Sequence, residues 1–232
     1  MVKATKDQVD QSTKGTRPKT RDRILQVARE LFNEHGEANV TLAHIGEHLG
    51  ISEGNVWYHF RTKNAVISAI FMELKAKVQA NQQRDVGDLR QVSQLQDLLT
   101  RGFHLMWEYR FLLRDNINWA VAQQDVYAQL IALTNQVHIF IENALKLLCQ
   151  SGILAIPEWQ IPIVATNLWI INRYWIDYCQ TRNGQEQITE QSVQEGIEQL
   201  RSIVFPYLTP LGRQILNRSD PMNTEENATN QA

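Results

Sequence analysis

Residues Thr41–Lys63 read TLAHIGEHLGISEGNVWYHFRTK, and this stretch decides the fold of the N-terminal region. It predicts two short helices joined by a tight turn at Gly50. Thr41 is placed to cap the first helix and Ser52 the second, because a hydroxyl oxygen accepts hydrogen bonds from the N–H groups of a first helical turn. The apolar residues of the second helix fall on one side, which leaves its polar residues facing outward.

Helices are also expected on both sides of this stretch. Apolar residues recur every three or four positions over Thr20–His35, with Gly36 as the stop, and a fourth helix begins near Lys63. The first three helices would share one small core. This is the pattern of a helix-turn-helix, whose second helix presents its N-terminal residues to base edges in the major groove of DNA. The pattern therefore indicates a DNA-binding domain at 19–64, with the motif at about 42–61.

The rest of the chain also has the helical spacing. The chain of 232 residues has only 11 Gly and 6 Pro, and no two-residue apolar alternation supports a sheet. An all-α fold is predicted, in which residues 65–216 form a helical domain between a basic arm (1–18) and a polar tail (217–232). The expected helices of this domain lie near 94–115, 116–124, 126–150, 158–181 and 190–207.

Composition and charge exclude several protein classes. The net charge is −2, and 43% of the residues are hydrophobic, which is typical of a globular chain. The longest apolar run, at 161–171, is too short for a membrane span, and no apolar stretch follows the basic N-terminus. We expect a cytoplasmic protein. Cys149 and Cys179 lie far apart, so neither a CxxC metal knuckle nor a disulfide framework is expected.

At Thr41-Leu42-Ala43-x-Ile45-Gly46-x-x-Leu49-Gly50-Ile51-Ser52-x-Gly54-x-Val56-x-Tyr58-His59-Phe60-x-x-Lys63 the sequence resembles the TetR family of bacterial transcriptional regulators. The resemblance covers roughly residues 20–69 and extends to the remainder only in pattern. It implies a homodimer with an N-terminal three-helix DNA-binding domain. It also implies a variable helical C-terminal domain that holds a ligand and the dimer interface.

The resemblance also implies a set of DNA contacts. It places Thr41 and Lys63, the first and last residues of the motif, on DNA phosphates. Glu53, Gly54 and Asn55, at the start of the second (recognition) helix, would lie near bases. Tyr58 and His59, at the end of that helix, would lie near the DNA backbone. At one position the family usually has tyrosine where this chain has Trp57, whose indole N–H donates but does not accept, so Tyr58 would share or replace that contact. The expected DNA-binding residues are Thr41, Ser52, Glu53, Gly54, Asn55, Trp57, Tyr58, His59 and Lys63.

Charge supports DNA binding only weakly. Residues 1–63 hold ten Lys and Arg against eight Asp and Glu. The basic residues cluster in the arm and at the start of the first helix, where they would follow the DNA backbone or enter a minor groove. A solvated, idle tail is an equally good interpretation of the arm.

Polar and aromatic residues on otherwise apolar helical faces suggest a ligand pocket in the C-terminal domain. These residues are His104, Trp107, Asn135, His138 and Asn167. The alternative is that they bond one another or neighbouring carbonyl groups. The helix at 158–181 is apolar nearly all round, and the last helix carries a matching stripe, so both helices would meet a second subunit. The expected dimer interface comprises Ile171, Trp175, Ile197, Leu200 and Val204.

Enzymatic activity and metal binding are not expected. The chain contains no P-loop or GxGxxG motif. His44 and His48, with Glu47 between them, are best interpreted as surface groups without a third placed ligand. We expect no catalytic residue, metal or cofactor.

The function that these features favour is a homodimeric transcriptional regulator, most simply a repressor released from a near-palindromic DNA operator by a small molecule. One alternative is a DNA-anchored helical module that docks a protein partner and has no small-molecule ligand. Another is a ligand-sequestering protein or an enzyme that has lost DNA binding. The intact motif disfavours the last of these, because neither of its functions needs a DNA-reading helix.

Overall fold

The computed structural model describes residues 19–85, 92–114, 124–183 and 189–219, and within these ranges the fold is all-α, as predicted. One isolated bridge, between Leu154 and Leu208, is the only β-type pairing there. No helix in these ranges is both long and apolar enough to cross a bilayer. The helices are α1 (Thr20–His35), α2 (Leu42–Leu49), α3 (Glu53–His59), α4 (Lys63–Asp85), α5 (Val92–Glu108), α6 (Phe111–Arg114), α8 (Gln124–Gln150), α9 (Ile161–Asn183), α10 (Glu190–Val204) and α11 (Pro210–Ser219).

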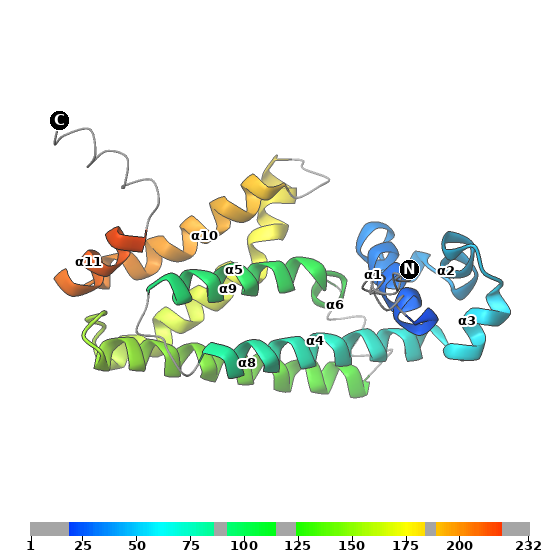
Figure 1. Cartoon of the computed structure of the whole chain (residues 1–232), viewed down its shortest axis with the longest axis horizontal. Coiled ribbons are helices and arrows are strands. Elements are labelled where there is room, and N and C mark those ends of the chain that lie inside the picture. The colour runs from blue at the N-terminus through cyan, green and yellow to red at the C-terminus, as the bar shows by residue number, and fades with distance from the viewer. Residues whose placement is uncertain (1–18, 86–91, 115–123, 184–188, 220–232) are drawn as a thin grey trace, which may run out of the picture.

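The molecule is elongated, with α1–α3 at one end and α11 at the other (Figure 1). The long helices α4 and α8 run along its length and contact each other, and α5 packs on α4. Helices α9 and α10 pack closely together, and both contact α5, while α9 also contacts α8. Helix α4, which begins at the N-terminal head (α1–α3), is therefore also a wall of the body (α5, α6 and α8–α11).

The first four helices form where the sequence predicts them. Thr41 Oγ1 accepts from His44 N at 3.2 Å, and Ser52 Oγ accepts from Asn55 N at 3.3 Å, so both hydroxyls cap their helices. Gly50 has a φ of 66°, the left-handed conformation that ends α2 and that glycine adopts without strain.

The later helices depart from the prediction in three places. The helix expected at 94–115 is interrupted between α5 and α6. The last predicted helix stops at Val204 and passes into a 3-10 turn at Phe205–Tyr207, where Pro206 supplies no N–H. Helix α11 was not predicted, and it starts where Thr209 Oγ1 accepts from Gly212 N at 3.0 Å. The helix predicted at 116–124 falls almost wholly outside the described residues.

Two hydrophobic clusters hold the described chain together. The first runs from α1 through α3 and α4 to the α5–α6 junction and the start of α8, and includes a Phe32–Phe111 ring contact at 5.1 Å. The second joins α5, the end of α8, α9 and α10. The first three helices share a core, as expected, but this core extends to α4 and the α5–α6 junction, because α1 buries its apolar face against the body as well.

Candidate functional site

The turn between α2 and α3 is held by a close backbone approach. Ile51 N donates to Gly46 O at 2.9 Å, and a Cβ added at Gly46 would lie 2.9 Å from Ile51 O. Only glycine therefore fits at this point of α2. Val56 is fully buried beneath the turn and anchors α3. These contacts fix the angle at which α3 leaves α2.

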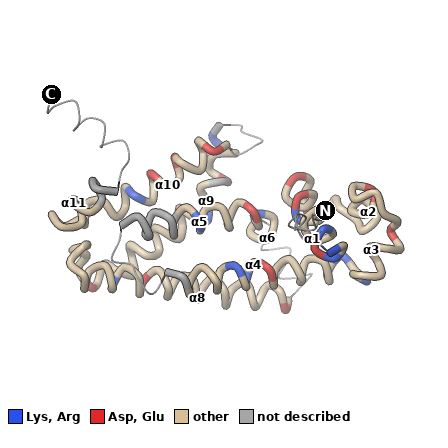
Figure 2. The backbone as a smooth tube through the Cα atoms, in the orientation of Figure 1, with Lys and Arg blue, Asp and Glu red and all other residues tan. Residues whose placement is uncertain are grey.

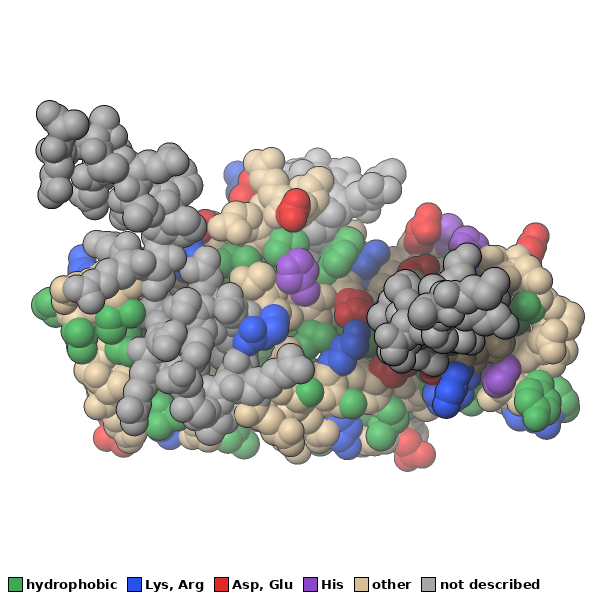
Figure 3. All heavy atoms as spheres, viewed as in Figure 1, with side chains coloured by type: hydrophobic (Ala, Val, Ile, Leu, Met, Phe, Trp, Pro, Cys, Tyr) green, Lys and Arg blue, Asp and Glu red, His purple; other side chains and the backbone are tan. Residues whose placement is uncertain are grey.

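Helix α3 presents the outward polar face that the motif predicts. Glu53, Asn55 and His59 are exposed, and Trp57 and Tyr58 keep 50% and 76% of their surface in solvent. Hydrophobic side chains are visible at this tip of the molecule (Figure 3). Both side chains therefore leave apolar surface in solvent that can contact another molecule.

Two aromatic side chains of α3 have neighbours that orient them. The Arg61 guanidinium lies 3.5 Å from the centre of the Trp57 ring, a cation–π contact that places a positive charge beside the indole. Tyr58 meets His59 edge-on, with ring centres 5.4 Å apart. Arg61, which was absent from the predicted DNA-binding set, is thus part of the same exposed surface.

Lys63 is engaged within the protomer. Its Nζ donates to Glu37 O at 2.9 Å and lies 2.8 Å from Glu37 Oε1. The predicted phosphate contact of Lys63 therefore competes with an ion pair that ties the start of α4 to the 3-10 turn Glu37–Asn39.

The end of the molecule formed by α1–α3 is not uniformly basic. Residues 19–63 hold six basic and six acidic side chains, and Figure 2 shows both signs of charge around α1 to α3. The excess of two basic groups in residues 1–63 therefore comes from the predicted arm, which lies outside the described residues.

A polar cluster joins α1 to the body. Arg29 pairs with Glu108 at 2.8 Å and donates to Tyr109 Oη at 3.2 Å, and Lys77 Nζ pairs with Glu108 at 2.7 Å. Burial lowers the pKa of Lys77, but its hydrogen bonds to Glu108 and Tyr109 and the charges of these two groups together outweigh burial and raise that pKa overall. Burial raises the pKa of Glu73, although Arg29 lies 3.7 Å away.

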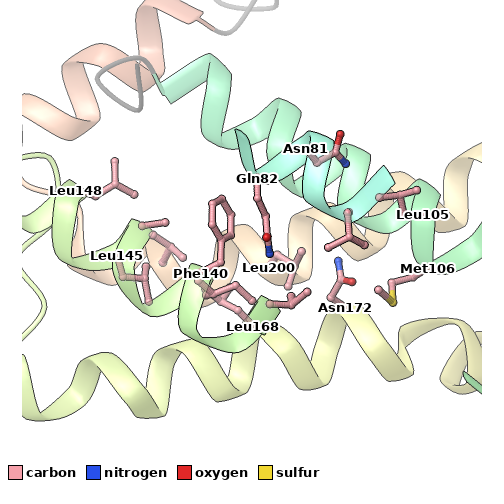
Figure 4. A pocket seen from close by; sticks show the side chains of 16 residues that line it. Asn81, Gln82, Leu105, Met106, Phe140, Leu145, Leu148, Leu168, Asn172 and Leu200 are labelled. Carbon is pink, nitrogen blue, oxygen red and sulfur yellow. The ribbon is translucent and has the colours of Figure 1, made fainter. Parts of the chain in front are cut away.

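A first cavity lies inside the body, between α4, α5, α8, α9 and α10, with a volume of about 130 Å³. Figure 4 shows aliphatic side chains around it, with the amides of Gln82 and Asn172 reaching between them. The described side chains that line it include no charged group. Its lining is Val78, Asn81, Gln82, Gly102, Leu105, Met106, Val137, Phe140, Ile141, Ala144, Leu145, Leu148, Leu168, Asn172, Leu200 and Val204.

A second cavity, of about 190 Å³, lies closer to the head and shares Val78, Met106 and Val137 with the first. Arg173 forms part of its wall and is 8% exposed. Arg173 donates to the Leu113 carbonyl and lies 3.5 Å from Asp177. Burial lowers the pKa of Arg173, and the charge of Asp177 opposes that shift.

The predicted ligand residues are placed differently. Only Asn135 lines either cavity. His138 lies 3.0 Å from Thr166 Oγ1 and 3.3 Å from Glu142, and Trp107 is covered by the Arg110 guanidinium at 3.6 Å. His104 and Asn167 are exposed. For His138, the contacts agree with the alternative that these groups bond their neighbours.

Family models match both parts of the chain. Residues 24–70 match the model described as bacterial regulatory proteins of the tetR family, and residues 72–216 match the TetR model described as a bacterial transcriptional repressor. The chain belongs to the TetR family. The boundary between the two matches falls within α4, just after the predicted end of the DNA-binding domain.

Two curated relatives match this TetR-family chain over a limited stretch. The transcriptional regulator UidR of Escherichia coli K12 is 41% identical over 54 residues, 23% of this chain, and TtgR of Pseudomonas putida is 31% identical over 74 residues, 32% of this chain. The chain spans only 28% and 31% of the lengths of these two relatives.

Solved structures match over most of this TetR-family chain. A TetR-family regulator from Marinobacter aquaeolei VT8 is 31% identical with a TM-score of 0.75, and the match covers 86% of this chain and 96% of that one. A complex of SmeT with triclosan is 23% identical with a TM-score of 0.62, covering 82% and 92%. A further structure describes SmeT as the repressor of the Stenotrophomonas maltophilia multidrug efflux pump SmeDEF. The SmeT likeness shows a shared fold.

The predicted dimer residues lie mainly inside this TetR-family protomer. Ile197, Leu200 and Val204 are at most 7% exposed and pack in the second hydrophobic cluster. Ile171 and Trp175 are partly buried, and Trp175 Nε1 donates to Ser192 O at 2.7 Å. Helix α10 buries its apolar stripe in the core of the protomer, so its described residues leave no exposed apolar stripe for a partner. The large exposed apolar side chains of α9 are instead Ile163, Ile170, Tyr174 and Tyr178.

Four polar residues of the body interior and its junction with the head were not among the predicted site residues. Asn33 is buried in α1, Gln82 lies on the cavity side of α4, and Asn172 and Arg173 are adjacent in α9. The sequence does mark the Asn172–Arg173 pair as unusual, because these two polar residues interrupt the most apolar helix of the chain. The sequence does not distinguish Gln82 from its neighbours, since it lies in the polar run Asn81-Gln82-Gln83-Arg84.

Proposed function

We propose that this chain is a homodimeric transcriptional repressor that binds a near-palindromic operator and is released by a small molecule held in its helical body. The observation that carries the proposal is the continuous core between α1, α4 and the α5–α6 junction. It joins a helix with an exposed polar face to a body that contains two cavities. A change in the body can therefore move the head as a unit.

DNA recognition would follow from the exposed face of α3. The start of this helix enters the major groove, where Asn55 is suited to bind adenine through two hydrogen bonds and Glu53 to accept from cytosine. The phosphates of the DNA backbone would then be contacted by the residues around this face, where Thr41, Tyr58 and Arg61 are exposed. The proposal adds Arg61 to the predicted contacts because it stands against Trp57.

Dimerisation supplies the second recognition helix. The exposed apolar residues Ile163, Ile170, Tyr174 and Tyr178 recur along one face of α9, which suits an isologous contact between two copies. Two heads read successive major grooves only if their spacing matches one DNA turn, roughly 34 Å, or a multiple of it. Any ligand that prefers a different spacing lowers operator affinity.

The ligand would act through the helices that form the cavity walls. Helix α4 begins at the head and lines both cavities, and α5 runs from the first cavity to Glu108, which pairs with Arg29 of α1. A ligand shifts such an equilibrium by its differential affinity for the two arrangements, commonly about 1–3 kcal/mol. Operator release is then a change in population.

The first experiment is footprinting of the full chain on DNA from its own genomic neighbourhood, in defined salt, with random DNA as the control. A protected near-palindrome is the expected result. Asn55→Ala should then alter base preference, whereas Lys63→Ala should weaken all sequences alike and flatten the salt dependence. Weak, sequence-blind binding would contradict the proposal and favour a DNA-anchored interaction module.

A further inference from the structure

The first cavity contains a hydrogen-bond donor with no partner. Gln82 Nε2 is buried, and among the described residues it makes no hydrogen bond. Figure 4 shows the Gln82 side chain extending from α4 into the middle of the cavity, between Phe140 and Leu200. Buried donors in folded proteins are nearly always paired, so an orphan donor that faces a cavity marks the place of a missing acceptor.

The rest of the cavity is apolar. Aliphatic and aromatic side chains from five helices form most of its wall, and the three amides of Asn81, Gln82 and Asn172 are the polar side chains among its described lining. An ionised group brought into such a site would lose its hydration without finding a counter-charge, which is costly. A neutral molecule would lose little and would gain dispersion and hydrophobic contacts.

From these observations we infer that the effector of this protein is a small uncharged molecule, largely apolar, with one oxygen acceptor that binds Gln82 Nε2. This inference rests on the proposed ligand-responsive function and names the chemistry of its ligand. The cavity volume of about 130 Å³ is of the same order as that of an apolar cavity, roughly 150 Å³, that admits an aromatic ring. An aryl ketone is one member of the class.

The neighbouring cavity argues against an anionic ligand. Arg173 is the charged residue in its described lining, but its guanidinium already donates to the Leu113 carbonyl and pairs with Asp177 at 3.5 Å. A carboxylate would have to displace these partners. Among the described residues Gln82 Nε2 has no partner to displace, so an uncharged acceptor has the lower cost of entry.

The position of Gln82 also connects this contact with the head. Gln82 lies nineteen residues after Lys63, the first residue of α4, so about 28 Å of one helix separates the ligand contact from the helix-turn-helix. A hydrogen bond at Gln82 acts on the same rigid element that leaves the DNA-reading domain.

The test is isothermal titration calorimetry of the full chain, without DNA, against three probes of similar size. Propiophenone carries a carbonyl where propylbenzene has a methylene group, and phenylacetate is anionic. We expect propiophenone to bind about tenfold more tightly than propylbenzene, as one buried hydrogen bond allows, and phenylacetate to bind most weakly.

Two matched variants assign the preference to the amide. Gln82→Met keeps the length of the side chain and removes the donor, so the ratio of the two affinities should fall to about one. Gln83→Met makes the same change at the exposed neighbouring position and should leave the tenfold ratio intact. A ratio that survives Gln82→Met would overturn the assignment.

The wild-type titrations are decisive even if Gln82→Met fails to fold. Equal affinities for the ketone and the hydrocarbon, tighter binding of phenylacetate, or no binding of any probe at millimolar concentration would each overturn the inference. Operator release is measured separately by footprinting. Ketone selectivity without any change in operator affinity would uphold the ligand chemistry and contradict only the release mechanism.

Discussion

Asn33 Oδ1 accepts a hydrogen bond of 3.0 Å from the backbone N–H of Phe111, at the point where α5 gives way to α6. Its Nδ2 donates to Glu108 O at 2.9 Å, so one side chain of α1 satisfies the backbone on both sides of the interruption. The rings of Phe32 and Phe111 pack beside this contact. The head and the body are thus joined by a polar clamp within an apolar surrounding.

Replacing Asn33 with Ala should destabilise the protein by about 1–3 kcal/mol, because the hydrogen bonds of the Asn33 amide to Phe111 N and Glu108 O would be lost. Urea unfolding followed by circular dichroism measures the change. The control is Asn39→Ala, which removes an exposed side chain that donates to His35 O. Equal effects of the two variants would show that the clamp contributes nothing specific.

Gly46→Ala should lower the melting temperature and abolish operator protection, because the new Cβ would lie 2.9 Å from Ile51 O and push α2 away from the turn. Gly54→Ala is the control, since its Cβ would meet only Ser52 Oγ at 3.8 Å. Its melting temperature should stay unchanged or rise slightly, as alanine favours helix over glycine. A normal melting temperature for Gly46→Ala would contradict the close approach of the backbones.

Glu37→Gln should strengthen binding to operator and random DNA alike, by a few-fold, because it frees Lys63 Nζ from its 2.8 Å ion pair for phosphate contact. The slope of affinity against salt concentration should steepen. Glu47→Gln removes the same charge from an exposed site on α2 and controls for the general loss of an acidic group. Identical gains in the two variants would argue against any role of the released lysine.

The partly buried carboxyl group of Glu73 should make the stability of the protein depend on pH. Burial raises the pKa of this carboxyl group, so the folded state favours its protonated form, and the associated stability is lost as pH rises through that pKa. Glu73→Gln should therefore be at least as stable as the wild type at neutral pH. The difference should vanish toward roughly pH 4, where the wild-type group is also neutral.

Thermal unfolding across this pH range tests the prediction, with exposed Glu34→Gln as the control. A Glu73→Gln variant that is clearly less stable at neutral pH would mean that the attraction to Arg29 outweighs burial.

The dimer proposal is tested by placing the same residue at two positions. Ile170→Asp puts a charge on the exposed face of α9, and it should give a folded monomer in sedimentation analysis. Ile197→Asp puts the charge into the second hydrophobic cluster, where Ile197 is 3% exposed, and it should unfold the protomer instead. A dimer that survives Ile170→Asp would contradict the proposed face.

The head could be predicted almost residue by residue because its signals are local. Caps at Thr41 and Ser52 and the stop at Gly50 act within one or two helical turns, so spacing in the sequence is enough to place them. The break after Glu108 has no local cause of this kind. Asn33, which lies 75 residues before Glu108 in the chain, hydrogen-bonds to both sides of this break, and the helical spacing of the body gives no indication of that contact.

The interior sites were harder to predict for a related reason. The helical spacing shows that Ile197, Leu200 and Val204 share a face, but it does not show whether that face meets the protomer or a partner. The same ambiguity hides Gln82, whose polar side chain looks like an ordinary surface residue until α5, α8 and α9 close around it. Tertiary packing decides both questions.

The continuous core between head and body limits how such proteins can exchange parts. A chimera cut at residue 64 would transplant Phe32 and Asn33 without Phe111, and it would place α1 against a foreign helix junction. The smallest transferable DNA-reading unit is therefore discontinuous and includes the α5–α6 junction. Operator specificity would be exchanged more safely by substituting exposed residues of α3 than by swapping whole heads.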